Sequence, residues 1–225
     1  LQQAMQEMIR NRLTSVQRLE ITSTNTPLER LLDASLEQDI DIIRRTKETV
    51  SHEAFYSAAD ALVQAKRVYI IGAGSSLALA TFLAHYMSLV FDAVQLINAT
   101  SEAQILQQIV HIGPGDALIG ISFPRYSKKA AKALRYASDR GASVIAITDS
   151  TLSPLASCAQ QVLLAKSDMV SFVDSLVGPL ALINALIVTV AIKKKDEVAK
   201  TLCDLENIWD EYGVYEKVEN KSDDL

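Results

Sequence analysis

Short apolar runs that alternate with helical segments are the feature that most constrains how this chain can fold. The runs are Arg67–Ile71, Ala93–Ile97, Ala117–Ser122, Ser143–Thr148 and Gln161–Ala165. Continuous apolar strands of this kind, interspersed with helices, are typical of a parallel sheet that is covered on both faces. The crossover connections between such strands are right-handed. The sequence therefore predicts an α/β fold, a three-layer α-β-α doubly wound domain over about residues 50–192.

Helices are predicted where apolar residues recur at steps of three and four. They cover residues 1–20, 28–43, 53–65, 76–90, 101–111, 128–140, 172–192 and 195–211. The polar stretch Thr22–Thr26 ends the first of these before Pro27 restarts the pattern, and Gly141 ends the helix over residues 128–140. We expect the acidic tail after Glu216 to fray.

Charge and cysteine content exclude several classes of function. The 225 residues are enough to bury a full core, and the net charge of −5 argues against a surface that binds nucleic acid over its whole extent. Cys158 and Cys203 lie far apart, without histidine or further cysteine at ligand spacing. We therefore expect reduced thiols, no metal site and no cofactor.

One segment has the composition of a membrane span. Leu176–Ile192 is almost wholly apolar and precedes three lysines, but Pro179 and Asn184 interrupt it and it is short for a bilayer core. Such a helix is predicted to be buried or to form an interface. The N-terminus also lacks the order of basic, apolar and small residues that marks a signal peptide. We expect a cytoplasmic protein with no membrane partner.

A glycine-rich loop, Gly72–Ser76 (GAGSS), follows the first predicted strand and opens a helix. Gly72 and Gly74 would let the backbone approach an anion. Free amides at the helix start, with the hydroxyls of Ser75 and Ser76, would then donate hydrogen bonds to it. The alternative for such a turn is tight packing, with the serines serving only as helix caps.

A second polar loop, Ser122–Ser127 (SFPRYS), lies between the third predicted strand and the next helix. Ser122 and Ser127 supply hydroxyls, and Arg125 adds a planar cation suited to phosphate. Ligands of doubly wound sheets bind outside the carboxyl ends of the strands, where the strand order reverses. With strand order 2-1-3-4-5, the two loops would face each other across one crevice.

A nicotinamide-dinucleotide site fits the first loop less well. The G-x-G-x-x-G fingerprint requires glycine where Leu77 stands, and Asn98 replaces the ribose-binding acid expected at the end of the second strand. The sequence therefore favours a smaller phosphorylated ligand.

Together the two loops resemble the SIS (sugar isomerase) domain, in which G-x-G-x-S and S-x-S-G-x-[ST] hold a phosphosugar. Gly72, Gly74 and Ser76 match the first motif, and Ser122 and Ser127 match the second. Pro124 and Arg125 replace its Ser-Gly pair. The resemblance implies a five-stranded parallel sheet in the order 2-1-3-4-5, with Gly72, Gly74, Ser75, Ser76, Ser122, Arg125 and Ser127 as the phosphosugar-binding residues.

The resemblance covers about residues 30–192 and is closest to the RpiR-type (MurR/RpiR family) transcriptional regulators. It is carried by Ile121–Lys128, Ile147–Leu155, Ser171–Leu186 and the lead-in residues Asp39, Ile43 and Thr46. In that family an N-terminal helix-turn-helix domain precedes a SIS domain that senses sugar phosphates. The implied organisation is a linker helix at 1–26 that follows a missing DNA-binding domain, a SIS domain at 27–212 and a flexible tail at 213–225.

What this resemblance implies is a non-catalytic effector-binding domain of a regulator of carbohydrate metabolism. Its partners would be a sugar-phosphate effector, a second copy in a homodimer or higher homo-oligomer, and DNA through the missing domain. The apolar surface of residues 28–43 and 172–192 exceeds what one small sheet needs to cover, which also favours a subunit interface.

An aldose–ketose isomerase remains the alternative, because SIS domains also occur in such enzymes. That reaction needs a placed base, usually glutamate or histidine. The candidates are Glu102, His85 and His111. Glu102 is expected to be a first-turn helix acid, His85 to lie in mid-helix, and His111 to lie near the amino-terminal edge of the sheet. No acid–base pair stands out among them, so a sensor is favoured.

Overall fold

The structure is a computed structural model that describes residues 14–99 and 101–215. Its centre is a sheet of five strands, β1 (Arg67–Gly72), β2 (Val94–Ile97), β3 (Asp116–Ile121), β4 (Ser143–Thr148) and β5 (Gln161–Leu164). All neighbouring pairs run parallel, in the order β2-β1-β3-β4-β5. The predicted fold and strand order are confirmed.

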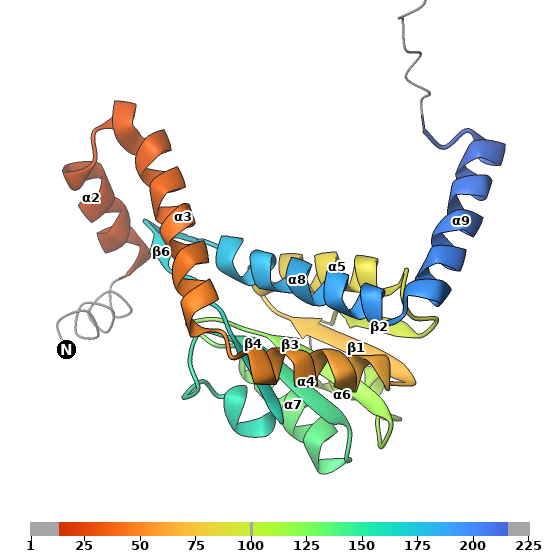
Figure 1. Cartoon of the computed structure of the whole chain (residues 1–225). Helices are drawn as coiled ribbons and strands as arrows, with labels where there is room; N and C mark the ends of the chain where they lie inside the picture. Colours follow the sequence, from red (N-terminus) through yellow and green to blue (C-terminus); the bar gives the residue numbers. More distant parts are fainter. Residues whose placement is uncertain (1–13, 100, 216–225) are drawn as a thin grey trace, which may run out of the picture.

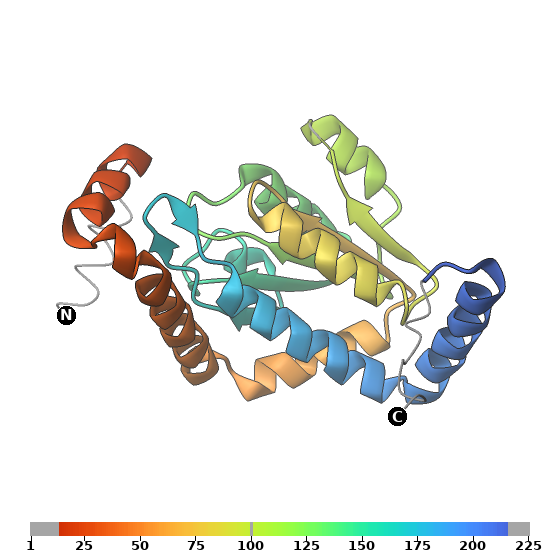
Figure 2. The same cartoon turned by 90° about the horizontal axis from the view of Figure 1, so that it is seen from above.

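Helices cover both faces of this sheet (Figures 1 and 2). One face packs against α4 (His52–Val63), α5 (Ser76–Met87) and α8 (Val177–Lys193), and the other against α6 (Glu102–Gln108), α7 (Lys128–Asp139) and the short η2 (Ala156–Cys158). Successive residues of β1 divide between the two cores. Val68 and Ile70 belong to the first, and Tyr69 and Ile71 to the second, because side chains alternate along a strand.

Two helical arms extend beyond these layers (Figure 1). At one end α2 (Ser15–Asn25), η1 (Leu28–Arg30) and α3 (Leu31–Thr49) lead into α4, and at the other α9 (Lys195–Tyr212) projects from the end of α8. Only Ile42 and Thr46 of α3 are buried, and no residue of α9 is. Among the described helices none is by itself long and apolar enough to cross a bilayer. The pair α8 and α9 reaches that length only jointly, across a bend of 100°.

The predicted end of the first helix is wrong. The part of residues 1–20 before Thr14 lies outside the described residues, but α2 continues through the polar stretch to Asn25. The hydroxyls of Thr22 and Thr24 donate to the carbonyls of Arg18 and Glu20, one turn earlier. These hydroxyls form their hydrogen bonds within the helix and therefore do not end it.

The predicted helix over residues 172–192 also begins too early. A two-residue antiparallel hairpin, β6 (Met169–Val170) and β7 (Val173–Asp174), precedes α8, which begins at Val177. Its turn places Ser171 at a φ of 62°, a left-handed conformation that no helix accommodates. Asp174 and Ser175, which follow this turn, accept from Ser75 and donate to Asp39, respectively. The hairpin is therefore described with the site below.

Candidate ligand-binding site

The two predicted loops lie at the point where the sheet changes winding direction. β1 and β3 are neighbours, and Gly72 at the end of β1 pairs with Ile121 at the end of β3. The helix that follows β1 packs on one face of the sheet, and the helix that follows β3 packs on the other. The loops Gly72–Ser76 and Ser122–Ser127 therefore leave the same sheet edge side by side, at the ligand-binding position of doubly wound folds.

The first loop requires both of its glycines, for different reasons. A Cβ on Gly72 would lie 2.4 Å from the carbonyl oxygen of Ser76, so only glycine allows this close approach of backbone to backbone. Gly74 has a φ of 61° and open space where its Cβ would be. The amides of Ser75 and Ser76 form no hydrogen bond within the described part of the chain. Two backbone donors are thus available at the start of α5.

The serines of this loop do not serve as simple helix caps. Ser75 occupies the N-cap position but forms no capping hydrogen bond with its side chain. Its hydroxyl instead donates to Oδ2 of Asp174 in β7, at 2.8 Å. Ser76 is buried, and its hydroxyl bonds to none of the described residues. The capping expected by the alternative is therefore not found, although the close approach at Gly72 is the tight packing that it also expected.

The second loop is closed by its own two serines. The Ser127 amide donates to Ser122 Oγ at 3.0 Å, and Ser127 Oγ caps α7 by accepting from the Ala130 amide at 3.2 Å. A hydroxyl that accepts one bond still has a proton to donate. Ser122 is buried directly after β3, so its hydroxyl is held at the carboxyl edge of the sheet.

Arg125 keeps a backbone shape that normally calls for glycine. Its φ is 64°, and its side chain is exposed. The SIS motif has glycine at this position, and a positive φ is the conformation that glycine adopts most readily. The exchange adds a guanidinium to the second loop.

Further cations follow directly in the chain. Lys128 and Lys129 form the first turn of α7, which contains no acidic residue. Cations at a helix N-terminus oppose the helix dipole, so this pair is unfavourable for the helix alone and favourable for an anion held beside it. Neither lysine was among the predicted site residues, although their position directly after Ser127 was the available signal.

Two carboxylates beside the loops were missed as well. Asp174 contacts Ser75, and Asp149, directly after β4, accepts a hydrogen bond from the Tyr126 hydroxyl at 2.8 Å. Burial of the phenol, with its hydrogen bond to Asp149 and the charge of that carboxylate, raises the pKa of Tyr126 well above its usual value. Asp149 was detectable, because it follows a strand at the carboxyl edge. Asp174 was not, because it fell inside a predicted helix.

Two of the three candidate bases lie apart from these loops, whereas Glu102 begins α6, which follows the carboxyl end of β2. Glu102 forms an exposed ion pair with Lys132, at 2.8 Å in the first turn of α6. His85 is exposed near the far end of α5, about 14 Å along that helix from Ser76 at 1.5 Å per residue. The carbonyl of His111 accepts from Arg67 at the start of β1, which confirms its position at the amino-terminal edge.

Comparison with known proteins identifies the family of this domain. A profile of the SIS domain matches residues 61–189. An uncharacterized HTH-type transcriptional regulator of Caldanaerobacter subterraneus subsp. tengcongensis is 28% identical over 166 residues, which make up 71% of this chain and 57% of the relative. The chain spans about half the length of the curated relatives it matches.

Solved structures agree with this assignment. The sugar isomerase domain of an RpiR transcription factor from Sphaerobacter thermophilus is 28% identical, with a TM-score of 0.75 over 79% of this chain and 99% of that one. The Vibrio vulnificus NanR protein complexed with ManNAc-6P is 20% identical, with a TM-score of 0.69 over 83% and 72%. Phosphoheptose isomerase GmhA from Neisseria gonorrhoeae, at 19% identity and a TM-score of 0.62 over 73% and 98%, has the same fold.

The profile covers more than half of the chain, and it spans both loops and the whole sheet. The chain belongs to the SIS domain family, and within that family it is similar to the SIS domains of RpiR-type transcriptional regulators.

Proposed function

We propose that this chain is the effector-binding domain of a sugar-phosphate-responsive transcriptional regulator and that it does not transform its ligand. The observation that carries the proposal is the pairing of Gly72 with Ile121, which brings two loops of free donors to one sheet edge. Relatives that are HTH-type regulators support the regulatory role. The NanR protein, which was solved with ManNAc-6P, supports the ligand class.

The phosphate of the effector binds between the two loops. Its oxygens accept hydrogen bonds from the amides of Ser75 and Ser76, as phosphates do at helix N-termini in other α/β proteins. They also accept from the hydroxyls of Ser75, Ser76, Ser122 and Ser127. Gly72 and Gly74 give the backbone the shape that exposes those amides. Arg125 in the second loop, with Lys128 and Lys129 directly after it, adds positive charge beside this position.

The sugar extends from the phosphate toward Asp149. The carboxylate of Asp149 lies beside the second loop and accepts hydrogen bonds from sugar hydroxyls. Inorganic phosphate carries no sugar hydroxyls, so this contact favours a phosphosugar.

Regulation then proceeds through subunit arrangement. The exposed apolar stripe on α3 makes a homodimer, and effector binding alters the relation of the two copies. DNA is bound by a helix-turn-helix domain joined to the N-terminal arm, and the chain works in the cytoplasm, where phosphosugars occur.

Thermal unfolding with a panel of ligands tests the proposal. Arabinose 5-phosphate, N-acetylmannosamine 6-phosphate and glucose 6-phosphate are added to the wild type and to a variant with both Ser76→Ala and Ser122→Ala. At least one sugar phosphate is expected to raise the unfolding temperature of the wild type, by an amount that grows with the logarithm of the ligand excess. None is expected to raise that of the variant. The proposal is wrong if no sugar phosphate acts, or if the variant responds as the wild type does.

An aldose–ketose isomerase is the second candidate, and one observation favours it. Asp149 lies beside the second loop with Tyr126 bonded to it, so a carboxylate and a phenol stand together where a proton could be moved. Turnover of a sugar phosphate that is abolished by Asp149→Asn, with binding retained, would establish catalysis at this site. Absence of turnover with every ligand that binds supports the sensor.

A further inference from the structure

The β6–β7 hairpin carries a side chain that competes for the proposed phosphate site. Ser75 donates its hydroxyl proton to Asp174 Oδ2 at 2.8 Å. An anion bound at the start of α5 needs that same proton, and its charge repels the Asp174 carboxylate. The ligand and Asp174 therefore cannot both be held by Ser75.

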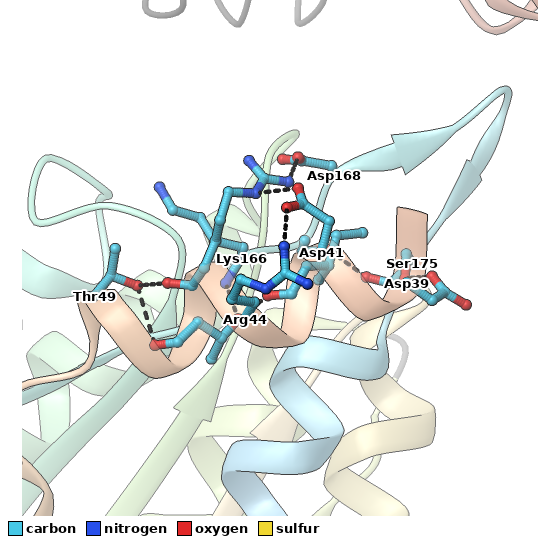
Figure 3. A network of polar contacts seen from close by, with 11 residues as sticks. Asp39, Asp41, Arg44, Thr49, Lys166, Asp168 and Ser175 are labelled. Carbon is cyan, nitrogen blue, oxygen red and sulfur yellow. Dashed lines mark hydrogen bonds and ion pairs between the residues drawn. The ribbon is translucent and has the colours of Figure 1, made fainter. Parts of the chain in front are cut away.

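The next residue of the same strand end connects to α3 (Figure 3). Ser175 is buried, and its hydroxyl donates to Asp39 Oδ1 at 2.6 Å. The Ser175 amide donates to the carbonyl of Asp168 at 3.1 Å, which joins the two ends of the hairpin. Asp168 in turn pairs with Arg45, one and a half turns further along α3. Both ends of the hairpin are thus tied to α3.

The lower part of α3 is fixed independently of the hairpin. Thr46 Oγ1 accepts from the Lys166 amide at 3.0 Å, directly after β5. A Cβ on Gly178 would lie 2.6 Å from the same oxygen, so α3 and α8 meet there without spare room. Asp39 lies about 10 Å from this anchor along the helix axis, and Leu31 about 22 Å. The polar contact at Asp39 therefore controls the longer, exposed part of α3 about a fixed point at Thr46.

The hairpin itself is a weak element that a ligand can move. Its strands are two residues each, which is marginal without support. Ser171 in its turn holds a φ of 62°, which costs free energy for a residue with a Cβ. Phe172 and Val173 are about half exposed. What holds the hairpin in place is the set of polar contacts to Ser75 and to α3.

We propose that this hairpin is a ligand-operated link: phosphate at the first loop displaces Asp174 from Ser75, the hairpin shifts, and the Ser175–Asp39 contact that restrains α3 is released. The link rests on the proposed function, because it gives the sugar-phosphate site a route to the helix that leads toward the N-terminus. Asp174 acts as the restraint of the empty site, and Ser175 and Asp168 transmit its displacement.

A ligand-free experiment isolates the link from the binding function. Ser75→Ala removes the restraint on Asp174, and hydrogen–deuterium exchange of peptides within residues 31–45 is expected to become about two- to tenfold faster, as for loss of one hydrogen bond. Ser88→Ala is the matched control, since Ser88 is the C-cap of the same helix and its hydroxyl donates to the local His85 carbonyl. Unchanged exchange in α3 of Ser75→Ala, or an equal change in Ser88→Ala, overturns the link whatever the protein binds.

A second experiment measures hydrogen–deuterium exchange in α3 after addition of a ligand. The ligands are inorganic phosphate and glucose 6-phosphate, and potassium chloride of equal ionic strength is the reference. In the wild type, whichever phosphate binds is expected to speed exchange in α3. Asp174→Asn is expected to bind it about three- to tenfold more tightly, because one repelling charge is gone. Ser175→Ala is expected to bind normally and to show no further response in α3. Binding without any change in α3, or weaker binding by Asp174→Asn, refutes the link and leaves the proposed function standing; no binding at all refutes the proposed function.

Discussion

The phenol of Tyr126 donates to Oδ1 of Asp149 at 2.8 Å, so that the second loop is tied to the end of β4. Tyr126→Phe removes this bond and leaves the ring in place. The free energy of unfolding is expected to fall by about 1 kcal/mol, the usual worth of such a bond. Urea unfolding measures the change, and Tyr136→Phe on α7, whose hydroxyl bonds at 3.4 Å, is the control with a weaker contact.

The same pair predicts a pH dependence. The folded-state pKa of Tyr126 is raised above its unfolded value, so this residue stabilises the fold below the unfolded pKa and loses that contribution as pH rises through the folded one. The unfolded pKa is about 10. We expect the stability difference between wild type and Tyr126→Phe to stay constant below about pH 9 and to shrink above pH 10. A difference that grows with alkaline pH would contradict this.

Substitutions of Arg125 distinguish the effect of its backbone conformation on stability from the effect of its charge on binding. Its φ of 64° disfavours any residue with a Cβ, so Arg125→Gly is expected to raise the free energy of unfolding by about 1 kcal/mol. The same change removes a cation from the phosphate site and is expected to weaken binding. Arg125→Ala keeps the backbone cost and loses the cation. If calorimetric titration finds equal affinity for wild type and Arg125→Ala, the guanidinium plays no part in binding.

Gly72→Ala tests the close approach at the first loop. The added Cβ would lie 2.4 Å from the Ser76 carbonyl oxygen, which the backbone can relieve only by moving the amides of the loop. We expect a loss of about 2 to 3 kcal/mol in unfolding free energy and loss of ligand-induced stabilisation. In Gly74→Ala the added Cβ meets no atom within 4 Å. The free energy of unfolding is expected to fall by only about 1 kcal/mol, the cost of a positive φ for a residue with a Cβ.

A change at the opposite edge of the sheet should affect stability alone. Buried Asp116 accepts from Arg67 Nε and Nη2, at 3.0 and 2.8 Å, and from the Gly113 amide at 3.0 Å. Asp116→Ala is expected to cost about 2 to 3 kcal/mol while sugar-phosphate affinity stays the same. Reduced affinity in this variant would show that binding tracks global stability rather than the two loops.

The proposed dimer can be tested on α3. Leu32, Leu36 and Ile40 repeat at one-turn intervals and are 70%, 54% and 53% exposed. Replacing Leu36 and Ile40 by glutamate is expected to turn a dimer into a monomer in sedimentation, because two charges would be buried at the contact. Glu37→Gln, a neighbour on the same helix, is the control. A wild type that sediments as a monomer at micromolar concentration contradicts the interface.

The sheet and its order were predictable because the three central strands, β1, β3 and β4, are buried on both faces and their apolar composition shows this directly. Both loops were predictable for a related reason, since small and polar residues directly after such strands mark the carboxyl edge. Arg125 was recognised as a departure from the SIS motif, but only the structure shows that it holds a positive φ, a conformation that glycine adopts more readily.

The hairpin escaped prediction because its evidence is not local. Met169–Asp174 is apolar enough to extend the following helix, and nothing in the segment shows that Asp174 contacts Ser75, 99 residues earlier. The same holds for Ser175 and Asp39, which are 136 residues apart. Contacts between residues so far apart in the sequence depend on how the helix layers pack on the sheet. Neither the spacing of apolar residues nor the secondary-structure propensity of a segment predicts them.

The bond between Thr46 and Lys166 also bears on how the chain folds. Its partners are separated by 120 residues, so α3 gains this contact only once all five strands have been assembled between them. Closing so long a loop early would cost chain entropy that no local contact returns. We therefore expect α3, although it precedes the sheet in the chain, to dock last during folding, after α8 has covered β5.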